Sequence, residues 1–266
     1  MITAELWFVV GAGVLTAVIC GLGTLPFFFV DEISPRVTVV LWGFAGGVML
    51  FASLFGFIVE GLEAGSIWEV SVGLFFGVAI VVGANWALTG YRFPVREMNE
   101  ADFRKLALIV GVLTVHSFPE GIALGVSFAE IGLTGDLVIG GMAIPALAVF
   151  VTLAVAIQNI PEGLAVAIPL FTYGVSRWRI FAWAVITSLP QPIGAAIAYV
   201  FVSIAYGFLP YGFGFAAGAM IYLVLHDIFP EAIDRGTGLA GRGYLELVVG
   251  ITTGVILMVP LFLLFG

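Results

Sequence analysis

Two short segments of this 266-residue chain place side chains that bind metals inside apolar sequence. The first is HSFPEGIAL at 116–124, and the second, QNIPEGLAV at 158–166, repeats its Pro-Glu-Gly core. His116 and Glu120 are four residues apart, as are Gln158 and Glu162, so each pair shares one face of a helix. Imidazole, carboxylate and amide groups together suit a borderline divalent ion such as Zn²⁺, Fe²⁺ or Mn²⁺.

The sequence around both segments is typical of membrane helices. The chain is 62% hydrophobic and 10% charged, whereas a soluble domain carries roughly 25% charged residues. Runs of about 20 apolar residues indicate membrane spans, so we expect an all-α polytopic membrane protein whose residues 1–266 form a single transmembrane domain. Without a basic patch, nucleic acid is excluded as a partner, and a single cysteine, Cys20, excludes an intrachain disulfide. The eight predicted spans are 5–30, 37–59, 70–90, 104–129, 140–171, 178–206, 211–233 and 243–265.

The basic residues fall on one side of these spans. The odd-numbered loops and their edges hold all nine: Arg36, Arg92, Arg96, Arg104, Lys105, Arg177, Arg179, Arg235 and Arg242. The positive-inside rule makes that side cytoplasmic and places both termini outside. The outer side carries carboxylates that would concentrate cations, although the insertion rule alone also explains the lack of Lys and Arg there. These carboxylates are Glu5, Glu60, Glu63, Glu69, Glu130 and Asp136.

An internal repeat gives these spans an order. GFAGGVML at 43–50 recurs as GFAAGAMI at 214–221, 171 residues later, and the same offset carries Glu60 onto Glu231. The two copies lie in spans of opposite direction, so we expect inverted repeats of three spans on either side of a central pair, a 3+2+3 arrangement. Secondary transporters often follow this plan, with their sites near the midplane. Small residues in the repeated segments also allow close helix packing.

The two glutamates of the central pair need a compensating charge. A charged group near mid-bilayer costs on the order of 3 kcal/mol on insertion scales, and two facing carboxylates cost more. A bound divalent cation would remove that cost. The alternative is structural: Glu120 or Glu162 is protonated and hydrogen-bonded to a nearby amide. Pro119 and Pro161 each withdraw a backbone donor beside the glutamate, which would free a carbonyl for water or an ion.

HSFPEG and QNIPEG resemble the paired motifs of the Zrt/Irt-like (ZIP) family of divalent-metal transporters. GFAGGVML and FAAGAMIYLVLHDIFPEA are similar to its short GufA-like branch. The resemblance implies eight spans, a binuclear metal centre between spans four and five, import of Zn²⁺ (and of Fe²⁺, Mn²⁺ or Cd²⁺) into the cytoplasm across the cell membrane, and an elevator-like motion. It also implies a homodimer embedded in the lipid bilayer, with the metal as transported substrate and no cofactor.

The family's site residues can be carried onto this chain position by position. The resemblance assigns the primary site to His116, Glu120, Gln158 and Glu162, with Met49 approaching from span two. The second site keeps Asn159 and both glutamates but departs from the family at two positions. Ser117 stands where Asn is common and Gln191 where Glu is common, which should weaken that site. Exit-side ligands would be His226, Asp227 and Glu231, which are also explicable as solvated residues at a helix end.

Two other functions fit parts of this pattern. A metal sensor or a non-transporting membrane paralogue would bind the ion without moving it. An intramembrane metalloprotease would also need buried His and Glu, but its HExxH motif is absent and the order here is His-xxx-Glu. We therefore expect a transporter and not an enzyme.

Overall fold

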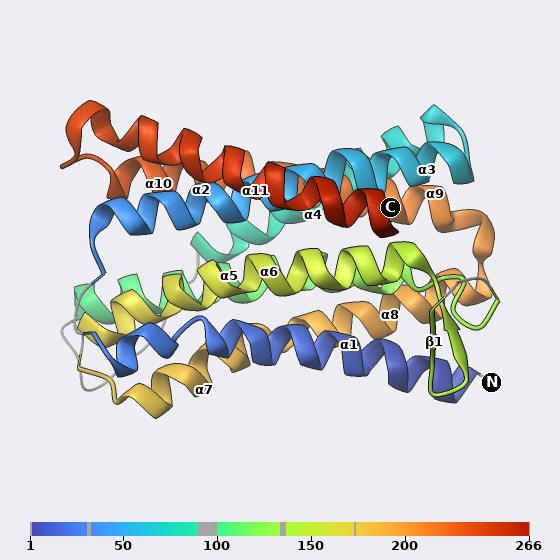
Figure 1. Cartoon of the computed structure of the whole chain (residues 1–266), viewed down its shortest axis with the longest axis horizontal. Coiled ribbons are helices and arrows are strands. Elements are labelled where there is room, and N and C mark those ends of the chain that lie inside the picture. The colour runs from blue at the N-terminus through green and yellow to red at the C-terminus, as the bar shows by residue number, and fades with distance from the viewer. Residues whose placement is uncertain (1, 31–32, 90–99, 134–136, 173, 266) are drawn as a thin grey trace.

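The computed structural model describes residues 2–30, 33–89, 100–133, 137–172 and 174–265. Long helices run side by side along the molecule, and both termini lie toward the same end (Figure 1). Seven helical stretches within the described ranges are long and apolar enough to cross a membrane, so the protein is an all-α polytopic membrane protein. The long helices are α1 (Ile2–Leu22), α2 (Pro35–Phe51), α4 (Ile67–Thr89), α5 (Glu100–Ser127), α6 (Ala146–Thr172), α8 (Pro190–Ile204), α9 (Leu209–Leu223) and α11 (Tyr244–Phe265).

Shorter elements connect these helices. They are η1 (Leu25–Phe28), η2 (Ala52–Ile58), α3 (Val59–Ala64), β1 (Leu137–Ile139), β2 (Met142–Ile144), α7 (Arg177–Thr187), η3 (Tyr206–Phe208), η4 (Val224–Ile228), α10 (Phe229–Arg235) and η5 (Ala240–Gly243). Prolines set several of the boundaries. Pro35 begins α2 behind the N-cap Ser34, and Pro190 begins α8, because proline is tolerated in the first turn of a helix.

One predicted span boundary was wrong, and one predicted span contains a break. The predicted span 140–171 begins instead at Ala146, because 137–144 forms an antiparallel hairpin that pairs Leu137 with Ile144. Gly140 and Gly141 both have positive φ angles, 59° and 81°, as a two-residue hairpin turn requires. The predicted span 178–206 corresponds to one apolar stretch, Arg177–Ile204, that is long enough to cross a membrane. Within it, α7 and α8 meet at Ser188 and Leu189 in front of Pro190.

Glycines bring α2 against α11 and α9 against α4. A Cβ atom at Gly43 or Gly47 would meet the backbone of α11 at Leu247 or Ile251. A Cβ atom at Gly214 or Gly218 would likewise meet α4, at Val70 or Leu74. The glycines of the second contact lie 171 residues after those of the first, so the repeated sequence makes the same helix contact twice. These matching contacts are what the predicted internal repeat requires.

The two repeated helices also change winding at matching positions. α2 continues into the π-helical η2 (Ala52–Ile58), and α9 continues into the π-helical η4 (Val224–Ile228). Each π segment is followed by a short α-helix, α3 or α10, near opposite ends of the molecule (Figure 1). π-Helical turns are rare and often occur at functional sites, so these two segments are candidate points of movement.

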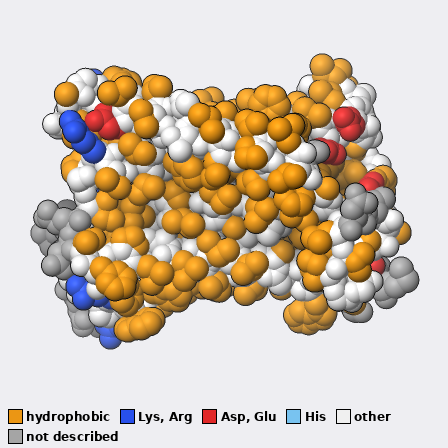
Figure 2. All heavy atoms as spheres, in the orientation of Figure 1, with side chains coloured by type: hydrophobic (Ala, Val, Ile, Leu, Met, Phe, Trp, Pro, Cys, Tyr) orange, Lys and Arg blue, Asp and Glu red, His pale blue; other side chains and the backbone are white. Residues whose placement is uncertain are grey.

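Charges collect at the two ends and leave an apolar middle (Figure 2). Arg and Lys side chains appear at the end that holds α7 and α10, and most of the acidic side chains appear at the end that holds α3. Five of the predicted basic residues are described in full: Arg36, Arg177, Arg179, Arg235 and Arg242. Arg92, Arg96 and Asp136 lie outside the described residues, as do the side chains of Arg104 and Lys105.

The close contacts at glycines predict different melting temperatures for two substitutions on α4. Gly77→Ala should lower the melting temperature of the detergent-solubilised protein, because the new Cβ would collide with the Phe215 backbone. Overpacking of this kind typically costs about 1–3 kcal/mol. Gly83→Ala on the same helix meets nothing within 4 Å and should leave stability unchanged or slightly higher. Equal melting temperatures for the two variants would contradict this account.

Candidate metal centre

Helices α5 and α6 bring the two Pro-Glu-Gly motifs together in the interior. Both helices continue across their prolines, Pro119 and Pro161, without leaving helical geometry. Glu120 and Gln158 have no exposed surface, and the exposures of His116 and Glu162 are 5% and 6%. Four polar side chains so deep in an apolar protein must satisfy one another.

The Glu120 carboxyl group is hydrogen-bonded to three neighbouring side chains in this cluster. Its Oε1 accepts a hydrogen bond from Gln158 Nε2 at 2.8 Å, and its Oε2 accepts one from Gln191 Nε2 at 2.7 Å. The carboxyl groups of Glu120 and Glu162 are also hydrogen-bonded to each other. Two carboxyl groups can share a hydrogen bond only when one of them carries a proton. A dication between them would replace that proton and neutralise both.

Gln191 is tied into a network with no hydrogen-bonding capacity left over. Its Oε1 accepts from Thr16 Oγ1 at 2.7 Å and from Asn159 Nδ2 at 3.0 Å. Its Nε2 donates to Glu120 and, at 3.2 Å, to Asn159 Oδ1. An amide has two donor hydrogens and two acceptor lone pairs. Both hydrogens are used and both lone pairs face a donor, although the Thr16 hydroxyl hydrogen is shared with the Gly13 carbonyl oxygen, 2.9 Å away. A metal ion could therefore reach Gln191 only by breaking this network.

Gln158 differs from Gln191 in this respect. Its amide nitrogen is bonded to Glu120, but its Oε1 is buried and has no hydrogen-bond partner among the described residues. An unsatisfied buried acceptor of this kind costs roughly 1–3 kcal/mol. A cation bound beside Glu120 would satisfy it. Of the two glutamine amides in the cluster, Gln158 is therefore the one suited to bind a metal.

His116 leads from this cluster toward the surface. Its Nε2 lies 3.1 Å from Asp227 Oδ2, and the other oxygen of Asp227 lies 2.8 Å from His226 Nδ1. The exposed fractions of the three side chains rise in order, from 7% through 20% to 56%. The predicted exit-side residues Asp227 and His226 thus join directly onto the predicted primary site.

Glu231 lies apart from this series. Its Oε1 accepts a 2.7 Å bond from Arg235 Nε one turn along α10. The ring of His226 also stacks on Tyr222, with centroids 4.8 Å apart. Of the three predicted exit-side residues, Asp227 and His226 therefore connect to His116, whereas Glu231 pairs with Arg235.

Met49 and Ser117 remain predictions as ligands. Both are buried, each with 1% of its surface exposed. Met49 lies on α2, which packs against α6, and Ser117 adjoins His116 on α5. Thr16 was missed in the sequence, although its hydroxyl bonds to Gln191 from α1. The only feature of the sequence that marks Thr16 is that it is a polar residue within an apolar span.

The acidic and imidazole groups do not form a metal site by themselves. Within the described ranges, no three His, Cys, Asp or Glu side chains are grouped so that they could hold a metal ion. A metal at Glu120 and Glu162 would therefore have to displace the hydrogen bond between them and recruit the Gln158 amide oxygen. The hydrogen bonds of the cluster fit such a change, because Gln158 Oε1 has no partner among the described residues.

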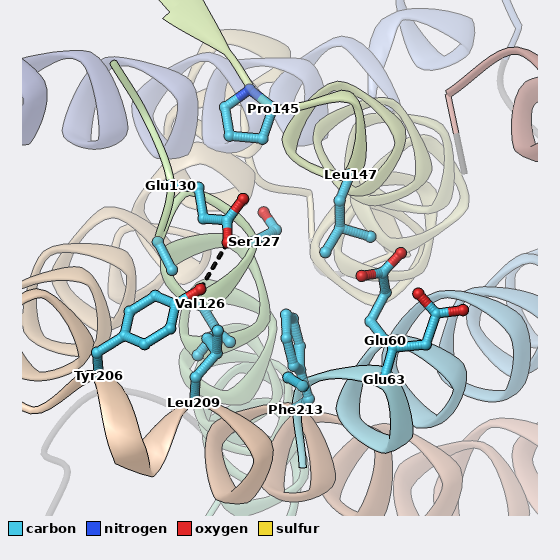
Figure 3. Close-up of a pocket in the computed structure, with 12 residues that line it drawn as sticks. Glu60, Glu63, Val126, Ser127, Glu130, Pro145, Leu147, Tyr206, Leu209 and Phe213 are labelled. Carbon is cyan, nitrogen blue, oxygen red and sulfur yellow. Dashed lines mark hydrogen bonds between the residues drawn. The ribbon is translucent and has the colours of Figure 1, made fainter. Parts of the chain in front are cut away.

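A second feature, an acidic cavity, lies near the C-terminal end of α5, which is the end farther from His226. Glu60, Glu63 and Glu130 line a cavity of about 330 Å³, and the Tyr206 hydroxyl donates a hydrogen bond to Glu130 (Figure 3). Val126 on its wall is six residues beyond Glu120, or about 9 Å along the helix. Apolar side chains complete the lining on this side: Val126, Leu147 and Phe213. The cavity is thus lined by three carboxylates and by apolar side chains together.

Known proteins resemble this chain over most of its length. The family described as "ZIP Zinc transporter" matches residues 96–261. The zinc transporter ZIPB of Bordetella bronchiseptica is 35% identical over 235 residues, which cover 81% of this chain and 69% of that protein. The zinc transporter GufA of Myxococcus xanthus is 28% identical over 269 residues, or 92% of this chain and 100% of its own length. A longer Arabidopsis thaliana protein is 40% identical over 219 residues, and this chain spans 33% of it.

The hydrogen bonds that occupy the Gln191 amide predict how many metal ions bind per chain. Calorimetry on the purified protein should show one strong Zn²⁺ site per chain in this region, because Gln191 adds no charge and its amide is already occupied. Gln191→Glu should add or tighten a second binding step, since a third carboxylate offsets the repulsion between two dications. At an effective dielectric near 20 and 4 Å, each unit-charge pair is worth about 4 kcal/mol. Tight binding of two ions by the wild type would disprove this interpretation.

Proposed function

This chain belongs to the ZIP zinc transporter family, and from that premise we propose that it imports divalent metal ions, with Zn²⁺ as the principal substrate. Members of the family are transporters, so the protein is not an enzyme and the protease interpretation is discarded. One observation carries the proposal: two buried, mutually bonded glutamates lie beside an unsatisfied amide oxygen. Neither glutamate has an arginine or lysine partner in the described part of the chain, so a divalent cation is the natural counter-charge.

The proposed path runs through three groups of side chains. Cations would collect at the acidic cavity of Glu60, Glu63 and Glu130, where fixed negative charge raises their local concentration. They would bind between α5 and α6, and then leave through Asp227 and His226. Because the exit-side residues lie toward the arginine-rich end, the positive-inside rule orients this path as import into the cytoplasm across the plasma membrane.

The proposed movement is a displacement of one helix group against the other. Glycine contacts hold α2 to α11 and α4 to α9, while the site lies on α5 and α6, with α1 and α8 packed beside them. Two groups with separate internal contacts can shift as rigid bodies. Alternating access of an inverted repeat uses such rocking around a central site. The 3+2+3 arrangement, the homodimer and transport of Fe²⁺, Mn²⁺ or Cd²⁺ belong to this proposal.

Glu162→Gln tests the transport function directly. The substitution keeps the shape of the side chain but removes half of the negative charge that would balance a dication. Uptake of Zn²⁺ into proteoliposomes should fall at least tenfold, as loss of a residue that supports a metal site commonly does. Folding should survive, because an amide can donate to Glu120 without a shared proton.

The matched control is Glu69→Gln, which changes an exposed carboxylate bonded to Ser66 at the outer end and should leave uptake unchanged. Normal uptake by a folded Glu162→Gln protein would refute the assigned role. Metal binding without uptake by the wild type would point instead to the sensor or non-transporting alternative.

Orientation can be tested with introduced cysteines, since the single native cysteine is buried. In intact cells, Leu133→Cys should react with a membrane-impermeant maleimide, because Leu133 is 75% exposed and near the predicted outer end. Thr237→Cys, in the exposed loop before η5, should react only after the cells are permeabilised. The reverse pattern would invert the proposed topology and turn import into export.

A further inference from the structure

Asn159 and Gln191 form a closed pair of amides next to Glu120. Asn159 Nδ2 donates to Gln191 Oε1 at 3.0 Å, and Gln191 Nε2 donates to Asn159 Oδ1 at 3.2 Å. Both side chains are fully buried. Such a ring can be closed in two ways, because exchanging the oxygen and the nitrogen of both amides keeps the two bonds between them. The direction of the pair is therefore decided by the groups around it.

Two acceptors at the ends of the pair set its direction. Asn159 Nδ2 also donates to the Thr16 carbonyl oxygen at 2.8 Å, and Gln191 Nε2 also donates to Glu120 Oε2 at 2.7 Å. A peptide carbonyl can only accept a hydrogen bond, whereas a carboxyl group can accept or donate. The Thr16 carbonyl is therefore the fixed end, because turning the pair over would place the Asn159 oxygen against it. With this direction set, Gln191 presents its nitrogen to Glu120.

The Thr16 hydroxyl fixes the position of Gln191 as well. Its oxygen lies 2.7 Å from Gln191 Oε1 and 2.9 Å from the Gly13 carbonyl oxygen. Two oxygens as close as 2.7 Å are held by a hydrogen between them, so the hydroxyl hydrogen is directed at both acceptors. Close packing of α1 against α8 allows this reach, since a Cβ atom on Gly13 would lie 2.6 Å from Pro192 Cα.

Thr16 therefore acts on Glu120 through Gln191. Gln191 Nε2 holds one oxygen of the Glu120 carboxyl group, and Gln158 Nε2 holds the other at 2.8 Å. Two donors in fixed places determine the plane of that carboxyl group. Hydrogen-bond partners that orient a metal-binding side chain typically contribute about 10–100-fold to metal affinity. A displacement of Gln191 should thus be felt as a loss of affinity at Glu120.

We propose that Thr16 is a positioning residue for Glu120, and that Asn159 and Gln191 form with it a neutral brace and are not ligands of the transported ion. The proposal rests on the metal site of the proposed function. The resemblance assigns the two amides to a second metal, but Gln191 Oε1 and Asn159 Oδ1 both already accept hydrogen bonds inside the protein. Helix α1 then contributes to metal affinity through Thr16 without supplying a ligand.

Thr16→Val and Thr16→Ser test the positioning role by calorimetry with Zn²⁺ on the purified full-length protein. Valine keeps the shape of the side chain, but a methyl group cannot stay 2.7 Å from Gln191 Oε1, so Gln191 must withdraw. The Kd for Zn²⁺ should rise about tenfold, at the lower end of the range for such partners. Thr16→Ser keeps the hydroxyl and should restore wild-type affinity. Thr16→Ala, which removes the bond without a clash, serves if the valine variant does not fold.

Thr24→Val is the matched control. Thr24 is also fully buried, and its hydroxyl donates to the Gly21 carbonyl oxygen at 2.8 Å, again three residues earlier in the chain. This variant should bind Zn²⁺ as the wild type does. Wild-type affinity in a folded Thr16→Val protein would overturn the proposal. Tighter binding or an added binding step in Thr16→Val would also overturn it, because Gln191 would then become a ligand once freed.

The metal-free protein provides a second readout that does not depend on transport. Gln158 and Gln191 are the only glutamines in the sequence, so isotope labelling of glutamine side-chain nitrogens should give an NMR signal for each, and Gln191→Glu identifies which belongs to Gln191. Thr16→Val should shift the Gln191 signal, and Thr24→Val should leave it in place. An unmoved Gln191 signal in Thr16→Val would overturn the proposed link.

Failure of this proposal can be told apart from failure of the proposed function. If Glu162→Gln loses Zn²⁺ uptake while Thr16→Val binds Zn²⁺ normally, only the role of Thr16 is wrong. If Glu162→Gln takes up Zn²⁺ normally, the metal site itself is refuted, and the positioning role falls with it.

Discussion

The contact between the Glu120 and Glu162 carboxyl groups is the constraint on which the rest of the structure depends. Both groups are almost completely buried in a protein whose surroundings are hydrocarbon, so neither can carry an uncompensated charge. They need a shared proton, amide donors or a cation, and the structure shows the amide donors, from Gln158 and Gln191 to Glu120. A dication bound between the two carboxyl groups would displace the hydrogen bond between them and supply the compensating charge itself.

The helix packing follows from this constraint. α5 and α6 can place their glutamates in contact only if neighbouring helices supply the remaining hydrogen bonds from close range. Gly121 lets α8 approach until Gln191 reaches Glu120, and Gly163 lets the backbone of α1 approach α6 just as closely. The glycines next to the glutamates are therefore part of the site, because any larger residue would push the supporting helices away.

Much of this arrangement could be predicted from the sequence. The spacing of the two Pro-Glu-Gly motifs, placed in adjacent apolar spans, correctly predicts that their glutamates meet. The hairpin at 137–144 was missed because its strands are as apolar as a span, and only the Gly-Gly turn distinguishes them. The bond between His116 and Asp227 was also not predictable, since it depends on how α9 and η4 pack against α5.

The repeat is symmetric in its backbone and asymmetric in its ligands. His116 corresponds to Gln158 and Ser117 to Asn159, while the glutamates Glu120 and Glu162 match. An ion at the proposed site would therefore meet different donors on its two sides: the imidazole on the side that continues to Asp227, and the amide oxygen on the other. A symmetric scaffold can exchange its outward and inward forms at little cost in packing. An asymmetric ligand set makes the ion's affinity differ between those forms, and only such a difference allows the bound ion to bias the exchange.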